Sequence, residues 1–444
     1  MRSTRNSTRS RARARRARIV SLVAAVVTPG LLVAVPGASA HAAPASPVRD
    51  VPVLPAHDGW ASADGGTTGG AGADGAHTYT VTTWEGLKRA LKDGGDAPKV
   101  IRVRGTLDGM GGRSCEDFAT GGYSLDAYLA AYDPKTWGTA PPAGPQEEAR
   151  AASAAAQAQQ VKAYVPANTT IVGVGRGARL LGGSLQIKDT DNVVVRGLTF
   201  EDAFDCFPQW DPADGDAGAW NSEYDNLVVH GSTHVWIDHN TFTDGRRPDS
   251  EQPLHYGQLF QQHDGELDVV RGADLVTVSW NVFADHDKTL MIGNSDSAGA
   301  TDRGKLRVTL HHNLFRNIVE RAPRVRFGKV DAYNNHFAVA AKGYAYSFGI
   351  GLESQLYAEK NTFALPAGVS AAKILKKWKD APVTAEGNHV NGAPADLVAA
   401  HNAANPGNPL REGAGWTPAL RTRVDPPQAV PALVTRRAGA PRTH

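Results

Sequence analysis

A dense group of cations marks one short stretch of the chain. In "RAPRVRFGK", Arg321, Arg324, Arg326 and Lys329 fall within nine positions, and Glu320 is the only acid beside them. Like charges packed this closely repel one another unless an anion lies between them. Arginine side chains bind carboxylates and phosphates through paired hydrogen bonds. The stretch therefore predicts a site for an anionic ligand.

Strand geometry decides which of these cations can act together. In an extended strand Arg324 and Arg326 point to the same face, and Pro323 allows a bend that would bring Arg321 alongside them. Lys288, in "ADHDKTLMIG", is a further cation. A lysine among aspartates is commonly a solvated charge paired with its neighbours, so its place in a site depends on the fold.

Three aspartates offer the complementary chemistry. Asp225 opens the segment "DNLVVHG", and Asp264 and Asp268 lie four positions apart in "HDGELDVV". On neighbouring strands, which are about 5 Å apart, such carboxylates can converge on one patch. Ligands that are all oxygen favour calcium over zinc. The alternative is that these aspartates cap helices and form turns, as loop aspartates commonly do.

The segment "WDPADGDAG", residues 210–218, looks even more like a calcium-binding loop. It lacks the glutamate that an EF-hand requires, and we predict a surface turn there. If the three aspartates bind calcium on one side and the arginines lie on the other, together they would form a groove for a polyanion.

Composition restricts what this polyanion can be. The 444 residues include 47 Lys and Arg against 45 Asp and Glu, so the basic clusters are local. Nucleic-acid-binding proteins usually carry a broad basic excess. We therefore expect no nucleic-acid partner.

The N-terminus has the layout of a secretory signal peptide. "MRSTRNSTRSRARARRAR" contains no acid, the apolar run "IVSLVAAVVTPGLLVAV" follows, and "ASAHA" at 38–42 offers cleavage sites. The apolar run is short and broken by Pro-Gly, which argues against a permanent membrane anchor. We predict a signal peptide over residues 1–42, a tether over 43–54 and one secreted domain over 55–444, without membrane association once the signal is removed.

Export makes disulfides possible, and the chain has two cysteines, Cys115 and Cys206. They could form one disulfide that ties an N-terminal loop to the body of the domain, or they could be two buried thiols. Two cysteines cannot supply a structural thiolate zinc site.

From about residue 168 onward, short runs rich in Val, Ile, Leu and Thr alternate with Gly, Asn and Asp. Five runs end in Asn-x-Phe, with the asparagines separated by 41, 32, 22 and 26 positions: Asn240/Phe242, Asn281/Phe283, Asn313/Phe315, Asn335/Phe337 and Asn361/Phe363. The shortest separation fits one coil of a parallel β-solenoid, and the longer ones fit a coil with an inserted loop. Stacked coils would bond Asn to Asn and stack Phe on Phe. A β-sandwich, the alternative, gives no reason for this repetition.

A solenoid must cover its ends. The segment 84–93 places Trp84, Leu87 and Leu91 on one helical face, and we predict that it caps the N-terminal end. "GPQEEARAASAAAQAQQVKAYV" should form a second helix. We expect the chain from "NGAPADLVAAHNAANPGNPL" onward to pack along the side. The prediction is a single-domain, all-β parallel β-helix with an N-terminal capping helix and long side loops.

Four stretches resemble the pectate lyases of polysaccharide lyase family 1: "FPQWDPADGDAGAWNSEYDN", "HVWIDHNTFTDG", "HDKTLMIGNSDS" and "RVTLHHNLFRNIVERAPRVRFGKVDAYNNHF". The similarity runs from about residue 55 to "VPALVTRRAGA", nearly all of the chain after the signal. The resemblance implies a right-handed parallel β-helix. It also implies cleavage of polygalacturonate by calcium-dependent β-elimination, which gives unsaturated oligogalacturonates.

The resemblance assigns three kinds of site residue: the Ca²⁺ ligands Asp225, Asp264 and Asp268, the substrate contacts Lys288 and Arg326, and the base Arg321. Arg324 would support the groove. The C5 proton of a uronate becomes acidic only when its carboxylate is neutralised, which calcium, Lys288 and Arg326 would do. Arginine is a poor base because its pKa is high. Neighbouring cations and burial are expected to lower the pKa of Arg321, and we predict activity that favours alkaline pH.

Three other functions are alternatives to calcium-dependent cleavage of polygalacturonate. A pectin lyase acting on methyl-esterified chains would not need a calcium site. A hydrolytic polygalacturonase would need an acid/base pair of carboxylates and a water, a role that Asp264 and Asp268 could be imagined to fill but that leaves the arginines unexplained. A non-catalytic polysaccharide-binding β-helix would be favoured by loss of Arg321 or Lys288, and both are present. We expect a secreted monomer.

Overall fold

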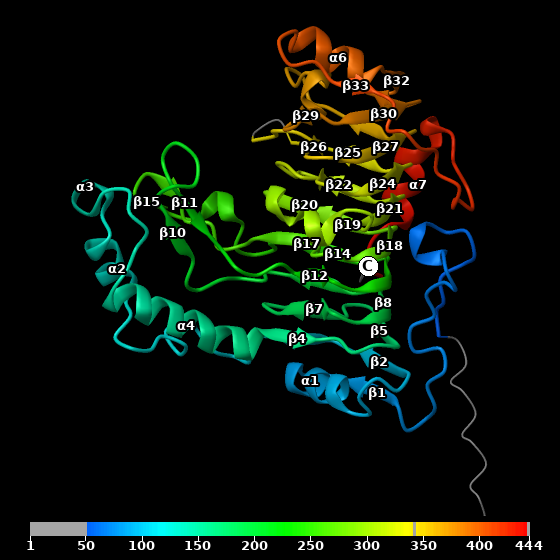
Figure 1. Cartoon of the computed structure of the whole chain (residues 1–444). Helices are drawn as coiled ribbons and strands as arrows, with labels where there is room; N and C mark the ends of the chain where they lie inside the picture. Colours follow the sequence, from blue (N-terminus) through cyan, green and yellow to red (C-terminus); the bar gives the residue numbers. More distant parts are fainter. Residues whose placement is uncertain (1–50, 341–342, 442–444) are drawn as a thin grey trace, which may run out of the picture. The chain divides into compact units, whose positions relative to one another are not determined.

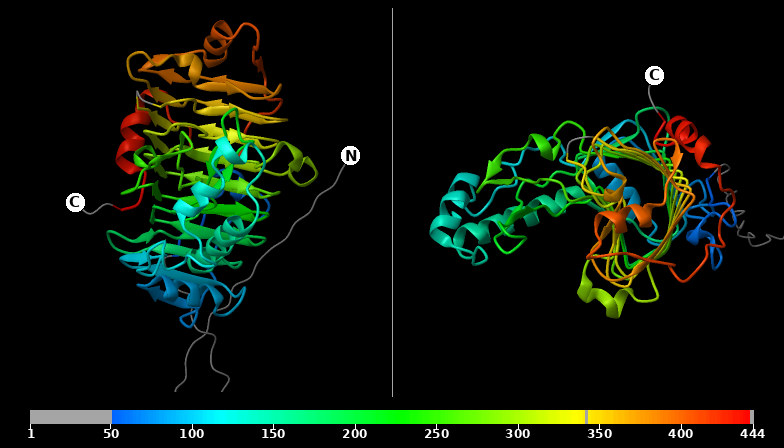
Figure 2. Two further views of the ribbon diagram at one scale, coloured as in Figure 1. Left: turned by 90° about the vertical axis from the view of Figure 1, so that its left-hand side faces the viewer. Right: turned by 90° about the horizontal axis from the view of Figure 1, so that it is seen from above.

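The computed structural model describes residues 51–340 and 343–441. In that part of the chain, successive coils stack on one another and their strands form three long sheets, A, B and C (Figure 1). Seen along the stack, the coils enclose one interior (Figure 2). The predicted parallel β-helix is confirmed. The predicted signal peptide, and the tether up to residue 50, lie outside the described residues.

Sheet A has eleven strands in the described residues, all paired in parallel, and begins and ends the stack. In spatial order they are β1 (Thr78–Val81), β2 (Lys99–Val103), β5 (Thr169–Gly173), β8 (Asp191–Arg196), β13 (Thr233–Asp238), β18 (Asp274–Ser279), β21 (Arg307–His311), β24 (Lys329–Tyr333), β27 (Gln355–Glu359), β30 (Pro382–Glu386) and β33 (Arg411–Glu412).

Sheet B has ten strands, and within it only the last described pair is antiparallel. Its order is β3 (Thr106–Asp108), β6 (Arg179–Leu181), β9 (Thr199–Glu201), β14 (Thr241–Thr243), β19 (Val282–Ala284), β22 (Leu314–Arg316), β25 (His336–Ala338), β28 (Thr362–Ala364), β31 (His389–Val390) and β32 (Ala393–Pro394).

Sheet C has eight strands in the described residues, again paired in parallel. They are β4 (Lys162–Tyr164), β7 (Ser184–Lys188), β12 (Leu227–His230), β17 (Gly265–Val270), β20 (Lys288–Ile292), β23 (Arg324–Val325), β26 (Phe348–Ile350) and β29 (Leu375–Lys377). Alternate residues of these strands point inward, and Leu227, Leu267, Leu290, Val325 and Leu375 are buried in the common core.

The turn from sheet A to sheet B carries the predicted asparagine ladder. The backbone N–H of Asn240 donates to Oδ1 of Asn281 at 2.8 Å, and the same bond repeats up the stack. It runs through Asn281, Asn313, Asn335 and Asn361 to Asn388. A residue in the left-handed region precedes each asparagine in this turn, as His239 does with φ of 51°. Each buried amide also satisfies neighbouring backbone groups that would otherwise lack partners.

The predicted phenylalanine stack lies inside the coils, next to the ladder. The Phe242 and Phe283 ring centres are 4.9 Å apart and nearly parallel, with an interplanar angle of 6°. The stack continues to Phe363, and Phe200 adds a ring below Phe242. The Asn-x-Phe pattern therefore has the role that the sequence predicted.

Both ends of the stack are covered by helices. Helix α1 (Trp84–Lys92) begins at the N-cap Thr83 and buries Trp84, Leu87 and Leu91, as predicted. At the other end, α6 (Leu397–Ala404) buries Leu397, Val398 and His401 against the last coils (Figure 1). This corrects the prediction that the chain from residue 391 packs along the side. Only the later part does so, where α7 (Val430–Arg437) packs on sheet B.

A side arm projects from the stack between sheets B and C (Figure 2). It contains α2 (Leu125–Ala131), α3 (Pro134–Trp137), α4 (Pro145–Val161) and the antiparallel pairs β10 (Gln209–Asp211) with β11 (Ala219–Asn221) and β15 (Leu254–His255) with β16 (Gln258–Leu259). The predicted second helix is thus confirmed as α4. Of the predicted surface turn at 210–218, residues 212–218 join β10 to β11, whereas Trp210 and Asp211 belong to β10 and Trp210 is buried.

The Cys115–Cys206 disulfide is present and ties two parts of the side arm together. The remaining short helices are α5 (Gly299–Asp302) and the 3₁₀ turns η1 (Trp60–Ser62), η2 (Asp249–Glu251), η3 (Asp296–Ala298), η4 (Ala371–Lys373) and η5 (Pro427–Ala429). Within residues 51–340 and 343–441, none of the helices has the length and apolar character needed to cross a bilayer.

Candidate active site

The predicted site residues come from four consecutive strands of sheet C. Asp225 lies just before β12, Asp264 and Asp268 bracket the start of β17, and Lys288 begins β20. The arginines lie at either end of β23. Because adjacent strands are about 4.8 Å apart, the parallel register brings together residues that are far apart in the sequence. The structure therefore groups all of the predicted site residues on one side of the stack.

Two of the three aspartates meet over a glycine. Gly265 donates its N–H to Asp225 Oδ1 at 2.8 Å, and Met291 donates its N–H to Asp268 Oδ1 at 3.1 Å. A Cβ at Gly265 would lie 2.7 Å from Asp225 Oδ1 and 2.9 Å from Asp268 Oδ1. Any other residue at 265 would therefore push the two carboxylates apart.

These carboxylates are buried and repel one another. Burial, then the charges of Asp268 and Asp264, raise the pKa of Asp225 well above its usual value. Burial and the charge of Asp264 raise the pKa of Asp268 to about 7, although Arg321 lowers it in part. A cation placed between these groups would relieve the repulsion.

The third aspartate is turned toward a lysine. Lys288 Nζ lies 3.5 Å from Asp264 Oδ1. Within the described residues, no three or more His, Cys, Asp or Glu side chains are gathered closely enough to hold a metal ion as they stand. The donor set nevertheless fits calcium in its chemistry, because it consists of carboxylates without cysteine or histidine.

Arg321 lies beside both kinds of charge. Its Nε donates to Glu320 Oε1 at 2.7 Å, and its backbone is in the left-handed region with φ of 60°. Burial lowers the pKa of Arg321, but Glu320, Tyr346, Asp264 and Asp268 together raise it above its usual value. The prediction of a lowered pKa is therefore wrong. The prediction left out Glu320, the adjacent residue in the sequence, and also Asp264 and Asp268, which neighbouring coils bring in.

Arg324 and Arg326 flank Val325, which is buried in the core and ends β23. Arg326 donates to Asp296 Oδ1 at 2.8 Å and to the Gly293 carbonyl at 2.9 Å. Arg324 instead faces outward, and burial, then Arg326 and Arg321, lower its pKa. A contact between Arg326 and a substrate stays a prediction.

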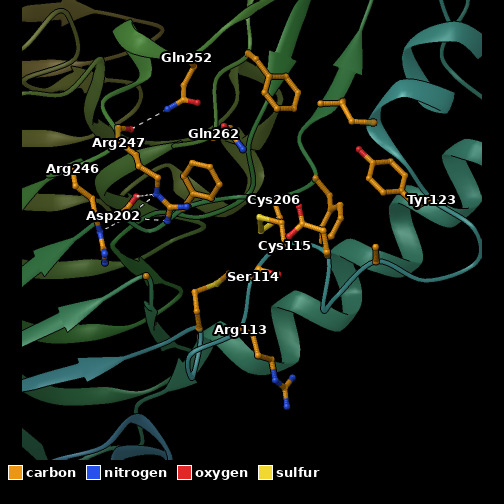
Figure 3. Close-up of a pocket in the computed structure, with 18 of the residues that line it drawn as sticks. Arg113, Ser114, Cys115, Tyr123, Asp202, Cys206, Arg246, Arg247, Gln252 and Gln262 are labelled. Carbon is orange, nitrogen blue, oxygen red and sulfur yellow. Dashed lines mark hydrogen bonds and ion pairs between the residues drawn. A yellow bond between two sulfur atoms is a disulfide. The ribbon is translucent and has the colours of Figure 1, made fainter.

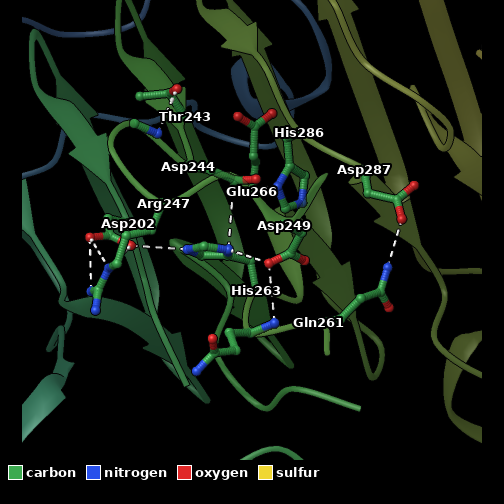
Figure 4. A network of polar contacts seen from close by, with 12 residues as sticks. Asp202, Thr243, Asp244, Arg247, Asp249, Gln261, His263, Glu266, His286 and Asp287 are labelled. Atoms are coloured by element: carbon green, nitrogen blue, oxygen red, sulfur yellow. Dashed lines mark hydrogen bonds and ion pairs between the residues drawn. The ribbon is translucent and has the colours of Figure 1, made fainter. Parts of the chain in front are cut away.

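A buried polar network around His286 and His263 contacts the backbone of Asp264 (Figure 4 shows the two histidines and their carboxylate partners). His286 contacts Asp244 Oδ1 at 2.6 Å through Nδ1 and the Asp264 carbonyl oxygen at 2.7 Å through Nε2. Burial lowers the pKa of His286, but Asp244 and Glu266 raise it more, to about 10. The charged imidazole thereby holds the backbone that carries Asp264.

A second histidine continues this network toward the side arm. His263 contacts Asp249 at 2.8 Å and Asp202 at 3.0 Å. Asp202 and His263 lie 61 positions apart, so only the stacking of coils brings them together. The one sequence signal was the recurrence of acids and histidines just after the strands of sheet B.

A large pocket in the described residues lies elsewhere. It has a volume of about 910 Å³ and is lined by side-arm residues that include Cys115, Tyr123, Cys206 and Phe204 (Figure 3). None of the predicted site residues lines it. Its Arg247 is bonded to Asp202 at 3.0 Å and so is already neutralised. We place the site on the outer face of sheet C, where the predicted site residues lie on consecutive strands.

Comparisons with known proteins agree with this arrangement. The family model described as pectate lyase matches residues 21–130 and 144–409. A pectate lyase of Bacillus subtilis (strain 168) is 44% identical over 398 residues, which cover 87% of this chain and 92% of that protein. A solved structure of a Bacillus subtilis pectate lyase variant superposes with a TM-score of 0.83 at 43% identity, covering 88% of this chain and 99% of the other. A solved structure described as pectate lyase bound to hexasaccharide gives the same TM-score of 0.83, identity of 43% and coverage of 88% and 99%.

Proposed function

The chain belongs to the pectate lyase family and is a polysaccharide lyase that cleaves polygalacturonate, and on this premise we propose which residues and which metal ion it uses. The reaction is a calcium-dependent β-elimination. Each predicted residue keeps its assigned role: Arg321 as the base, Lys288 and Arg326 as contacts of the substrate carboxylate, and Asp225, Asp264 and Asp268 as calcium ligands.

One observation supports this proposal above the others. Along sheet C, the charge changes from carboxylate on β12 and β17 to cation on β20 and β23, within four consecutive strands. Arg321 is close enough to Asp268 that each shifts the pKa of the other. Carboxylates and guanidinium groups thus face one short segment of any chain that lies across these strands.

The carboxylate group suits calcium, and a uronate would complete the set of oxygen ligands. Asp225 and Asp268 lie side by side over Gly265, and Asp264 is one residue from that glycine. When bound, calcium would supply positive charge that neutralises the uronate carboxylate and so makes the C5 proton more acidic.

The chain's own residues then have defined tasks. Arg321, in its neutral form, accepts the C5 proton of the uronate, and the electron pair of the C5–H bond forms the C4–C5 double bond. The C4–O bond breaks and its electron pair leaves with the glycosidic oxygen, which takes a proton from solvent. Lys288 and Arg326 hold the carboxylate and stabilise the charge that develops next to C5. The left-handed backbone of Arg321 fixes where its guanidinium can reach.

The charges of the site favour free carboxylates over methyl esters. Lys288, Arg321 and Arg324 are cations of this site, and a free carboxylate can form ion pairs with them whereas a methyl ester cannot. This argues for polygalacturonate and against highly esterified pectin as the better substrate.

The remaining proposals concern the whole protein. The predicted signal peptide at 1–42 supports secretion, with residues 43–54 as a tether to one domain over 55–444. The described strands form one stack, and we propose that the protein acts as a monomer without a membrane or nucleic-acid partner.

Incubation with polygalacturonate at alkaline pH, with calcium or with a chelator, tests the proposal. The readout is the ultraviolet absorbance of the conjugated double bond in unsaturated uronates. We expect absorbance that rises with calcium and disappears with the chelator. New reducing ends without that absorbance would mean hydrolysis. If the absorbance is undiminished in chelator, the reaction does not require a metal ion.

A further inference from the structure

The outer face of sheet C presents one continuous row of side chains, the outer row. Strand register pairs its members directly, from β4 at one end to β29 at the other. In order they are Tyr164, Gln186, Val228, Asp268, Met291, Arg324, Gly349 and Lys376. The residues that alternate with them fill the core. Seven strand steps of about 4.8 Å give this row a length of roughly 34 Å.

The outer row extends well beyond the predicted catalytic residues. Arg324 and Lys376 lie two strands apart, on β23 and β29, which is a step of about 10 Å. A polymer that lies along the row therefore meets side chains beyond Arg321. The proposed reaction gives these side chains no role.

An exposed tryptophan lies at the β29 end of the row. Trp378 is 41% exposed, although its backbone N–H is fixed by the Ile350 carbonyl at 2.8 Å. The described residues include few other exposed large apolar side chains. An indole that stays in solvent while its backbone is held in a sheet edge is unusual, because burial of such a ring is favourable.

Two cations flank this ring. Arg324 Cζ lies 4.2 Å from the ring centre and Lys376 Nζ lies 5.2 Å from it. Nε of Arg324 is buried without a hydrogen-bond partner in the described part of the chain. The indole therefore lies against two positive charges, which a bound carboxylate can also contact.

This combination matches one unit of a polyuronate. The C–H face of a pyranose ring is apolar and can cover an indole, and the carboxylate on the same ring can accept hydrogen bonds from Arg324 or Lys376. A neutral sugar would gain only the stacking contact, and a simple anion only the charge contact.

We propose that Trp378, with Arg324 and Lys376, forms a distal subsite that binds a galacturonate unit of the substrate away from the bond that is cleaved. The inference rests on the proposed function for its substrate. It makes Trp378 a residue that determines chain-length preference, because only oligomers long enough to reach β29 gain its binding energy.

The test compares substrates of two lengths. Initial rates of double-bond formation are measured on trigalacturonate and hexagalacturonate for the wild type, Trp378→Ala, Trp378→Phe and Trp137→Ala. Trp137, on the side arm, is the matched control because it is 38% exposed and lies outside sheet C. Thermal unfolding of each variant verifies that it folds.

We expect Trp378→Ala to lower kcat/KM on the hexamer about 3- to 30-fold more than on the trimer, mainly through KM, because stacking and cation–π contacts are worth that much. Trp378→Phe should lose less, and Trp137→Ala should not separate the two lengths. Equal losses on both lengths, or none, would overturn the subsite.

A binding measurement separates this inference from the proposed reaction. In an Arg321→Ala background, which removes the proposed base, calorimetry with hexagalacturonate should show weaker binding when Trp378→Ala is added. If the wild type forms no double bond but the binding difference is present, the reaction is wrong and the subsite stands. If the wild type is active and the difference is absent, the subsite is wrong and the reaction stands.

Discussion

Lys288 Nζ lies 3.5 Å from Asp264 Oδ1, so a proposed substrate contact and a proposed calcium ligand are paired with each other. Both side chains are partly shielded, with 12% and 35% exposed. Whatever takes Asp264 as a ligand must replace Lys288, and Lys288 then becomes available for a carboxylate. The pairing therefore couples metal binding to substrate binding.

The variant Lys288→Ala tests this coupling. It removes the cation that competes for Asp264, so calcium affinity should rise about two- to fivefold, the value of a partly exposed ion pair. Activity should fall at the same time, because a carboxylate contact is lost. Calcium titration followed by thermal unfolding, together with rates on polygalacturonate, measures both. A parallel fall of affinity and activity would contradict the coupling.

Asp268→Asn should separate stability from metal binding. Without calcium, the variant should unfold at a higher temperature than the wild type, because it removes one of several buried, mutually repelling carboxylates. With calcium at about 100 times its dissociation constant, the wild type should gain about 2.7 kcal/mol and the variant much less. Scans in chelator and in calcium provide the comparison. Equal calcium stabilisation of both proteins would exclude Asp268 as a ligand.

Arg321→Lys should abolish most activity while the fold is kept. Loss of a positioned base costs about 10²- to 10⁴-fold in rate. Because carboxylates raise the pKa of Arg321, its neutral form is rare at neutral pH, and the wild-type rate should rise about tenfold per pH unit toward alkaline pH. Rate profiles on polygalacturonate, with unfolding curves as the control, test this. An optimum at acidic pH would be incompatible with Arg321 as base.

Asn313→Ala should destabilise the stack strongly. Its side chain donates to the Val278 carbonyl at 2.9 Å and accepts the Asn281 backbone N–H at 2.9 Å, and both groups are buried. Leaving two buried groups unpaired costs about 2–6 kcal/mol. Asn388→Ala, at the last described rung, should cost less. Urea unfolding measures the two losses, and an equal cost at both positions would mean that the ladder is not cooperative along the stack.

Acid should destabilise the protein through His311. Burial, then His312, His239 and Arg421, lower its pKa well below the usual value, so the folded protein keeps it neutral. Below about pH 6.5, His311 becomes protonated in the unfolded chain but stays neutral in the folded protein. The free energy of unfolding should therefore fall by up to about 1.4 kcal/mol per pH unit through this group. His311→Phe keeps a ring stacked on Tyr333, which lies 5.1 Å away. Unfolding free energies between pH 7.5 and 5 should show a smaller slope for the variant, and an unchanged slope would exclude His311.

The stack itself was predictable because its signals are local. Each Asn-x-Phe pattern spans three residues, and its repetition indicates that successive coils share the same structure. The helix α6 was missed for the opposite reason. Its eight residues follow a stretch rich in Gly and Pro, and nothing local says that Leu397 and Val398 meet the last coil rather than its side.

The site residues were predictable in type but not in their partners. Asp264 and Lys288 lie 24 positions apart, and His286 meets Asp244 across 42 positions. The first separation is one coil, from β17 to β20, and the second also contains the side-arm loop between β14 and β17, which no repeat governs. The predicted direction of the Arg321 pKa shift was wrong because it left out Glu320, the adjacent residue, and Asp264 and Asp268, which come from other coils. Arg326, turned to Asp296, shows that the end of a strand cannot be located from alternation alone.

The asparagine ladder fixes the spacing of the contacts that a bound polymer can make along the outer row. Because every rung fixes one coil above the next, positions along the outer row change only in whole steps of about 4.8 Å. A sugar chain has its own repeat length, so its units align with the strand spacing at some positions and not at others. Deleting one coil between Arg324 and Trp378 would therefore shift the subsite by one full step, and product lengths would change discontinuously rather than gradually.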